Sequence, residues 1–187
     1  MFNLFSDHVN SDFDFLKKSK LLVCISGGVD SMVLIDLLRR LNYDVSVAHC
    51  NFKLRGDESD LDEKFVKKYC YDNSIQFFSK SFHTKLPNHS LQMAARTLRY
   101  DWFNELLKNN NKDYILTAHH LDDSLETFII NLSRASGIEG FTGISPINDK
   151  IVRLLTIFSK KQILKYAKIN KIHWREDSTN KKDGKHE

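Results

Sequence analysis

Short apolar runs alternate along the chain with longer segments in which apolar residues recur at three- and four-residue spacing. The short runs predict buried strands, and the longer segments predict helices that pack on them. The predicted strands are Lys20–Ile25, Asp44–His49, Ile75–Lys80, Tyr114–Ala118 and Ile151–Leu155. The predicted helices are Met1–Lys18, Met32–Leu41, Ser59–Asn73, Ser90–Leu107, Leu121–Arg134 and Ser159–Asn170.

Because helices separate consecutive strands, this order predicts a doubly wound α/β fold with one parallel five-stranded sheet and right-handed crossovers. We expect the strand order 3-2-1-4-5. Ligands bind such sheets beyond the carboxyl ends of the strands, where the strand order reverses. That point lies between the first and fourth strands, so residues 26–31 and 119–126 should face each other across one crevice.

The helix predicted at Leu121–Arg134 carries a continuous apolar stripe. We expect this stripe to pack on the core of the domain, as the apolar face of an amphipathic helix does. The stripe consists of Leu121, Leu125, Phe128, Ile129 and Leu132.

Two glycines separate the first strand from its helix. Gly27 and Gly28 let the backbone turn tightly with several N–H groups aimed at one point, and the helix N-terminus adds partial positive charge there. Ser26 and Ser31 supply hydroxyl donors, and Asp30 supplies a carboxylate suited to Mg²⁺. The pattern predicts a phosphate-binding loop. From the glycines alone, a corner in which they only relieve strain is an equal alternative.

A second polar cluster follows the fourth strand. Asp122, Asp123 and Glu126 crowd one end of a helix. The helix dipole stabilises first-turn acids by about 0.3–1 kcal/mol, which accounts for the two aspartates but less well for Glu126. Carboxylates beside His119 favour a cation site, for Mg²⁺ or for a substrate ammonium group.

Two arginines share one face of the helix predicted at Ser90–Leu107. Arg96 and Arg99 suit charge stabilisation of a phosphate, because the guanidinium group is planar and always charged. Pairing with surface acids is the alternative.

Length and charge fit one domain over residues 1–187, with an N-terminal helix at 1–19 and a basic segment at 159–187. That segment holds nine Lys/Arg and four Asp/Glu, whereas the whole chain has a net charge of +4. A basic end suggests a polyanion such as RNA, although charge alone favours a solvated lysine-rich face.

The three cysteines suggest a reducing compartment. Cys24, Cys50 and Cys70 form no Cys-x-x-Cys pair, and Cys24 is expected to be a small buried hydrophobe. The sequence shows no apolar run near 18 residues and no secretory leader pattern, so we expect a cytoplasmic protein without membrane contact.

The glycine segment reads Ser-Gly-Gly-Val-Asp-Ser and lacks the lysine of a Walker loop. It resembles the PP-loop of the N-type ATP pyrophosphatases, which have a Rossmann-like fold. Further segments extend the resemblance to the tRNA(Ile)-lysidine synthase family, over roughly residues 20–182. These segments are His49–Arg55, Ala95–Tyr100, Thr117–Thr127, Arg134–Gly137 and Trp174–Asn180.

The resemblance implies a reaction and its partners. ATP adenylates the C2 oxygen of the wobble cytidine in an isoleucine tRNA with a CAU anticodon, and the amine of free L-lysine then displaces AMP. The implied cofactors are ATP and Mg²⁺.

The resemblance also implies roles for individual residues. Ser26, Gly27, Gly28, Val29, Asp30 and Ser31 would hold the ATP phosphates, with Asp30 and Asp123 placing Mg²⁺. Arg99 and His119 would serve catalysis, and Glu126 would receive the lysine ammonium group. Arg55, Arg96 and Arg134 would contact tRNA or phosphate.

Two alternatives remain open at this point. The first is another PP-loop tRNA-modifying enzyme such as a cytidine thiolase, although such enzymes use Cys-x-x-Cys pairs. The second is a nucleotide-binding module without catalysis. The family's Arg-Asn-x-x-Arg motif and its C-terminal accessory domains do not follow Asp177–Asn180, so we expect a shortened form that lacks those domains.

Overall fold

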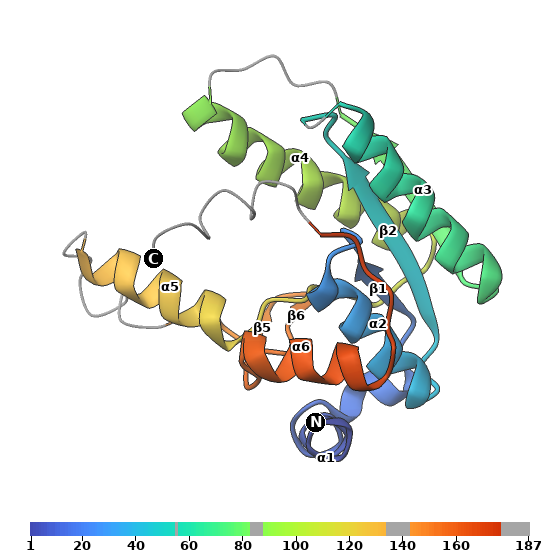
Figure 1. The fold of residues 1–187 in the computed structure, drawn as a ribbon, viewed down its shortest axis with the longest axis vertical. Helices are drawn as coiled ribbons and strands as arrows, with labels where there is room; N and C mark the ends of the chain where they lie inside the picture. The colour runs from blue at the N-terminus through green and yellow to red at the C-terminus, as the bar shows by residue number, and fades with distance from the viewer. Residues whose placement is uncertain (55, 83–87, 134–142, 177–187) are drawn as a thin grey trace.

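The computed structural model describes residues 1–54, 56–82, 88–133 and 143–176; for residues 88–92 it describes the backbone alone. Its centre is a six-stranded sheet of order β3-β2-β1-β4-β6-β5 (Figure 1). The strands are β1 (Leu21–Cys24), β2 (Val45–Asn51), β3 (Gln76–Ser81), β4 (Tyr114–Leu116), β5 (Ile147–Asn148) and β6 (Ile151–Val152). The predicted order is confirmed, with β6 as the expected fifth strand.

The sixth strand was not predicted. β5 runs antiparallel to β6, whereas the other four pairs are parallel. The two strands join through Asp149, which adopts a positive φ of 51°, and Lys150. A two-residue strand is too short to show a hydrophobic period, so the sequence pattern does not reveal it.

The helices lie close to their predicted positions. They are α1 (Phe2–Asp12), α2 (Val29–Arg40), α3 (Asp57–Asp72), α4 (Asn88–Asn109), α5 (Leu121–Ser133) and α6 (Lys160–Ile169), with a 3-10 helix at Asp14–Lys18 after α1. No helix in the described ranges is long and apolar enough to cross a membrane.

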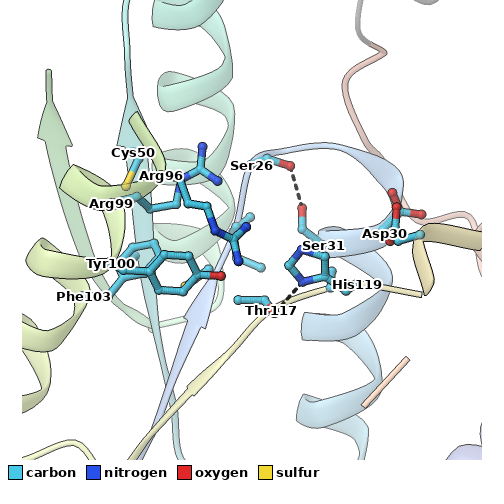
Figure 2. Close-up of a pocket in the computed structure, with 15 residues that line it drawn as sticks. Ser26, Asp30, Ser31, Cys50, Arg96, Arg99, Tyr100, Phe103, Thr117 and His119 are labelled. Carbon is cyan, nitrogen blue, oxygen red and sulfur yellow. Dashed lines mark hydrogen bonds between the residues drawn. The ribbon is translucent and has the colours of Figure 1, made fainter. Parts of the chain in front are cut away.

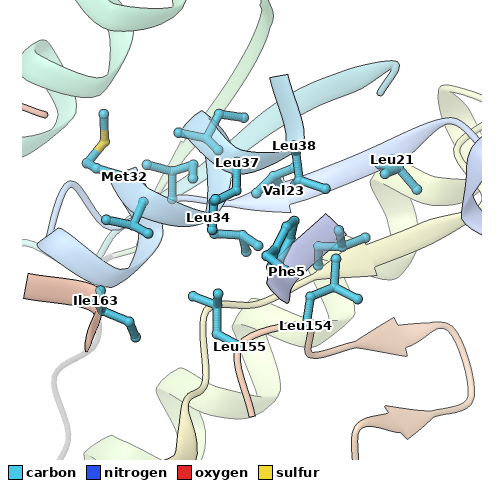
Figure 3. Packing of buried hydrophobic residues seen from close by; sticks show 14 of the residues in the cluster. Phe5, Leu21, Val23, Met32, Leu34, Leu37, Leu38, Leu154, Leu155 and Ile163 are labelled. Carbon is cyan, nitrogen blue, oxygen red and sulfur yellow. The ribbon is translucent and has the colours of Figure 1, made fainter. Parts of the chain in front are cut away.

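Alternate residues of β1 face two separate cores, as expected when helices cover both faces of a sheet. Leu21 and Val23 belong to a large cluster with α1, α2, α3 and α6, in which Phe5 and Leu34 are fully buried (Figure 3). Leu22 faces the other way, into a smaller cluster built by α4. The central strand and its glycine loop are therefore held from both sides.

The predicted core stripe of α5 is largely exposed, which corrects the sequence interpretation. Leu121, Leu125, Ile129 and Leu132 are 47–57% exposed, and Phe128 is half-buried. In Figure 1 α5 runs away from the sheet beyond β6. The period of a helix identifies an apolar face, but it does not say whether another element covers that face. Leu61 in α3 and Leu98 in α4, two further leucines on predicted helices, are exposed as well.

Candidate active site

A cavity of about 270 Å³ opens at the carboxyl ends of β1, β2 and β4. Four segments wall it: the glycine loop, the end of β2, the α4 helix and the junction between β4 and α5 (Figure 2). The two polar segments expected to face one crevice thus meet there. The predicted site residues that line it are Ser26, Asp30, Ser31, Arg96, Arg99, His119 and Asp123.

The glycine loop has the shape of an anion cradle. Gly27 takes a φ of +97°, a conformation that side chains disfavour, and α2 begins two residues later at Val29. The Ser31 hydroxyl donates to the Gly28 carbonyl at 2.9 Å, and the hydroxyl oxygens of Ser26 and Ser31 lie 3.3 Å apart. Gly27, Gly28 and Val29 form the turn without lining the cavity themselves. Hydrogen bonds within the loop shape it, and the Arg175 backbone N–H, which donates to the Gly27 carbonyl at 2.9 Å, holds it from outside.

Asp30, in the first turn of α2, is paired with a lysine from far along the chain. The ammonium group of Lys160 lies 2.7 Å from both carboxylate oxygens of Asp30. The Nε2 atom of buried His120 lies 3.7 Å from the same carboxylate. Asp30 is thus the centre of a polar junction between α2, α5 and α6.

The two aspartates at the start of α5 stabilise helix ends. Asp123 accepts a hydrogen bond from the His120 backbone N–H at 2.8 Å, as the third residue of a capping box does. Asp122 accepts from the backbone N–H of Lys160 at 2.8 Å and so joins the first turns of α5 and α6. These contacts are consistent with a structural role for both residues, while Asp123 also lines the cavity.

Glu126 is exposed and lies outside the cavity wall, one turn further along α5. His119 lies inside the wall, where its Nδ1 atom is 2.8 Å from the Thr117 hydroxyl. Burial and the nearby Arg153 lower the pKa of His119. The imidazole is therefore neutral at neutral pH, and its Nε2 atom can form a hydrogen bond with a ligand.

Arg96 and Arg99 reach into the cavity from α4 (Figure 2). Their guanidinium groups lie over the rings of Tyr100 and Phe52, at 5.0 and 5.3 Å from the ring centres. Neither arginine forms an ion pair with an acid in the part of the chain that the structure describes. The aromatic rings hold the two cations in place without neutralising them, so both can meet a phosphate.

Cys24 and Cys50 also line the cavity, and Cys24 is half-buried and packs against the smaller core cluster, as a small hydrophobe would. Burial raises the pKa of the Cys50 thiol to about 12, although Arg99 opposes this shift. Cys50 is therefore protonated at neutral pH and a weak nucleophile.

Sequence reasoning missed two basic residues near the cavity. Lys160 pairs with Asp30, and Arg153 is buried with its Nη1 donating to the Ser145 carbonyl at 2.7 Å. Arg153 is the one charged residue in the apolar run that was predicted as the fifth strand. A charge within a buried strand was the feature of the sequence that could have identified it. Lys160 gave no comparable signal within a lysine-rich helix. Arg55 and Arg134 lie outside the described residues.

The acids of the cavity fit a Mg²⁺ ion that arrives with phosphates. Mg²⁺ keeps several waters and uses one or two carboxylates together with substrate phosphates. Asp30 and Asp123 line the same cavity and provide two. The described residues contain no group of three or more acidic, histidine or cysteine side chains that could hold a metal by itself.

Comparison with known proteins agrees with this geometry. The chain belongs to the PP-loop domain family, which matches residues 3–185. It is also similar to curated tRNA(Ile)-lysidine synthases: it is 40% identical over 180 residues to that of Bacteroides thetaiotaomicron and 43% identical over 164 residues to that of Porphyromonas gingivalis strain W83. A third, from Chlorobaculum tepidum, is 41% identical over 167 residues.

These matches cover 94%, 85% and 85% of the chain but only 42%, 36% and 50% of the respective relatives. The chain thus spans half or less of the length of these relatives. The resemblance inferred from the motifs is confirmed.

Solved structures agree on the fold. A U34-tRNA thiolase from Methanococcus maripaludis matches with a TM-score of 0.72 at 17% identity, over 93% of this chain and 65% of that one. An NH3-dependent NAD synthetase from Campylobacter jejuni matches with a TM-score of 0.59 at 12% identity, over 96% of this chain and 77% of that one. At such identities the likeness concerns the fold alone.

Proposed function

We propose that this chain catalyses the ATP-dependent attachment of free L-lysine to C2 of the wobble cytidine in an isoleucine tRNA with a CAU anticodon. One observation carries the proposal: the glycine loop, Arg96 and Arg99, and the His119–Asp123 segment line a single cavity. The similarity to curated tRNA(Ile)-lysidine synthases over most of the chain supports the choice of substrates.

In the first step the cytidine C2 oxygen attacks the α-phosphorus of ATP, and the bond to pyrophosphate breaks. The N–H groups of the glycine loop and the N-terminus of α2 would hold the departing pyrophosphate. Arg96 and Arg99 would stabilise the negative charge that develops on the phosphates. Mg²⁺, held by Asp30 and Asp123, would supply further charge neutralisation at the same phosphates.

In the second step the lysine amine attacks C2, the bond from C2 to the AMP oxygen breaks, and the amine gives up a proton. Glu126 would attract the ammonium group and accept that proton. Because Glu126 lies on α5 just beyond the cavity wall, lysine would enter from the α5 side, opposite the arginines of α4.

The thiolase alternative finds less support in the cysteines. Two of the three line the cavity, but Cys70 is buried in α3 within the large core cluster. The raised pKa of Cys50 also makes it a poor sulfur carrier. A nucleotide-binding module without catalysis is the second alternative, and the experiment described below distinguishes it from an enzyme.

We further infer that residues 1–187 act as one catalytic domain in the cytoplasm, where ATP, lysine and tRNA are present together. The basic segment at 159–187 would contribute to tRNA binding through its positive charge.

The decisive experiment incubates the protein with ATP, labelled lysine and an isoleucine tRNA carrying a CAU anticodon. We expect AMP release that depends on lysine, and label in the tRNA that mass spectrometry places on the wobble cytidine. A tRNA with uridine at the wobble position is the matched control and should stay unlabelled. AMP release without any response to lysine would favour the thiolase class, and ATP binding without AMP release would favour the module.

A further inference from the structure

The glycine loop contains no lysine, yet an ammonium group lies at its end. In Walker loops the lysine directly follows the glycines and reaches the terminal phosphates. Here residues 27–31 include no lysine. In the structure, Lys160 Nζ lies 2.7 Å from each carboxylate oxygen of Asp30, which lines the cavity.

Lys160 is held at that position by the start of α6. Its backbone N–H donates to Asp122, and the preceding residue, Ser159, forms a capping box with Gln162. Further along the helix, the Tyr166 hydroxyl donates to Asp36 of α2 at 2.8 Å. The α6 helix is therefore fixed to α2, the helix that begins at the glycine loop, so the lysine side chain starts from a rigid base.

The surroundings explain why a cation is needed there. Asp30, Asp122 and Asp123 bring three carboxylates close to the point where the loop would receive phosphates, and His120 lies 3.5–3.7 Å from all three. An unpaired Asp30 would repel an anion at the loop. Pairing with Lys160 cancels the charge of Asp30, so the carboxylate no longer opposes the attraction of phosphate to the N-terminus of α2.

The pair is also partly open to solvent. The Lys160 side chain is 39% exposed and that of Asp30 is 26% exposed. The ammonium group can therefore exchange one anionic partner for another without unfolding its surroundings, since a partly exposed ion pair contributes little to stability.

We propose that Lys160 supplies, from α6, the phosphate-binding cation that the glycine loop lacks. In the free protein its ammonium group neutralises Asp30, and with ATP bound it contacts the terminal phosphates. This inference rests on the proposed function, in which the glycine loop holds the ATP phosphates.

The test compares the binding of ATP, pyrophosphate and AMP by isothermal titration calorimetry in wild-type, Lys160→Met, Lys160→Arg and Lys161→Met proteins. Lys161 is exposed on the same turn, so its substitution matches the change in net charge. For Lys160→Met we expect about tenfold or weaker binding of ATP and pyrophosphate, the change that loss of one charge-assisted hydrogen bond causes. AMP binding should stay within about twofold, and Lys160→Arg should restore most of the ATP affinity.

Equal ATP affinities in Lys160→Met and Lys161→Met would overturn the proposal. Equal weakening of ATP and AMP would also overturn it, because a purely structural role affects both ligands alike. A wild-type protein that binds neither ATP nor pyrophosphate would instead refute the proposed function itself.

A second variant keeps the test valid if Lys160→Met fails to fold. Asp30→Asn releases the ammonium group from its partner and is nearly isosteric. In buffer containing a chelator and no divalent cation, we expect Asp30→Asn to bind ATP more tightly than the wild type, because the Lys160 ammonium group no longer has to leave a carboxylate. Equal or weaker binding under those conditions would contradict a role for Lys160 as a phosphate ligand.

Discussion

Helices α2 and α5 both begin at the edge of the cavity, directly after strands β1 and β4, and both carry apolar stripes. Eight residues of α2 are buried, among them Leu34 and Leu37, whereas none of α5 is. α2 follows the central strand and packs against α6, but α5 runs outward beyond β6 (Figure 1). Position in the sheet, and not the local pattern, decides which helix is covered.

Because α2 is buried and α5 is exposed, the two sides of the proposed site differ in local stability. The proposed phosphate side is built on a buried helix that is connected to α6 through Asp30 and Asp36. The proposed amine side, with Glu126, lies on α5, a helix with no buried residue and so with low local stability. We expect perturbations of the phosphate side to be severe and those of the α5 side to be mild.

The largest effect is expected for Gly27→Val. Gly27 has a φ of +97°, and a side chain there would lie 3.5 Å from Val66. A Cβ at this position meets only ordinary contacts, so we expect the fold to survive at a cost of about 1–3 kcal/mol from backbone strain. ATP affinity should fall by about a hundredfold or more, because the strained turn no longer presents its N–H groups to the phosphates.

Gly56→Val is the matched control for this backbone strain. Gly56 also has a positive φ, of +53°, but it lies in open space at the start of α3, away from the cavity. It should lose comparable stability in urea unfolding while ATP binding stays at the wild-type level. A folded Gly27→Val protein with unchanged ATP affinity would disprove the role of the loop.

A pair of leucine substitutions tests the comparison of α2 with α5 directly. Leu34→Ala should lower the free energy of unfolding by about 2–5 kcal/mol, because Leu34 is fully buried in the large core cluster. Leu125→Ala should change it by less than about 0.5 kcal/mol, because Leu125 is 57% exposed. Urea unfolding of the two variants measures both values, and a large loss for Leu125→Ala would mean that the apolar face of α5 is covered in solution.

The same contrast shows what the sequence could and could not predict. The alternation of strands and helices led to the strand order, and the glycine turn led to the edge of the sheet where the cavity lies, because both depend on local rules. The burial of the α5 stripe was predicted wrongly, since Leu125 and Ile129 have a helical period but no covering element in the described part of the chain.

Long-range pairing was beyond the sequence for a different reason. Lys160 and Asp30 are 130 residues apart, and nothing in the lysine-rich sequence of α6 distinguishes Lys160 from Lys161. Only the packing of α6 on α2 selects the first of them. The charge on the phosphate side therefore could not be predicted from the loop motif.

Glu126→Gln sharpens the comparison on the amine side. Because Glu126 is exposed, its attraction for an ammonium group is screened, and we expect the KM for lysine to rise only about three- to tenfold. The KM for ATP should stay unchanged. Steady-state kinetics with each substrate varied in turn measures the split.

Glu105→Gln on α4 is the control for this change, since Glu105 is also exposed and pairs only loosely with Lys80, at 3.6 Å. It should leave both KM values unaltered. An equal rise of the two KM values in Glu126→Gln would remove Glu126 from the amine site.

The smallest effect is expected for the pH dependence of stability, through His49, which contacts the end of β1. His49 is buried, its Nδ1 lies 2.8 Å from the Ile25 carbonyl just before the glycine loop, and burial lowers its pKa. The unfolded chain therefore binds a proton more readily than the folded one. The contribution of neutral His49 to stability is complete above the unfolded pKa of about 6.5 and is lost as the pH falls through the lower folded pKa.

Urea midpoints measured at pH 7.5 and 5.5 should therefore decrease at the lower pH, and His49→Gln should reduce that decrease. His8 provides the control, because it lies in α1 at the far end of the core and pairs with Asp12 at 2.9 Å. His8→Gln should leave most of the decrease in place. If His49→Gln has the same pH dependence as the wild type, protonation of His49 does not cause the loss of stability. The hydrogen bond between His49 and the Ile25 carbonyl would then contribute little to the stability of the strand end before the glycine loop.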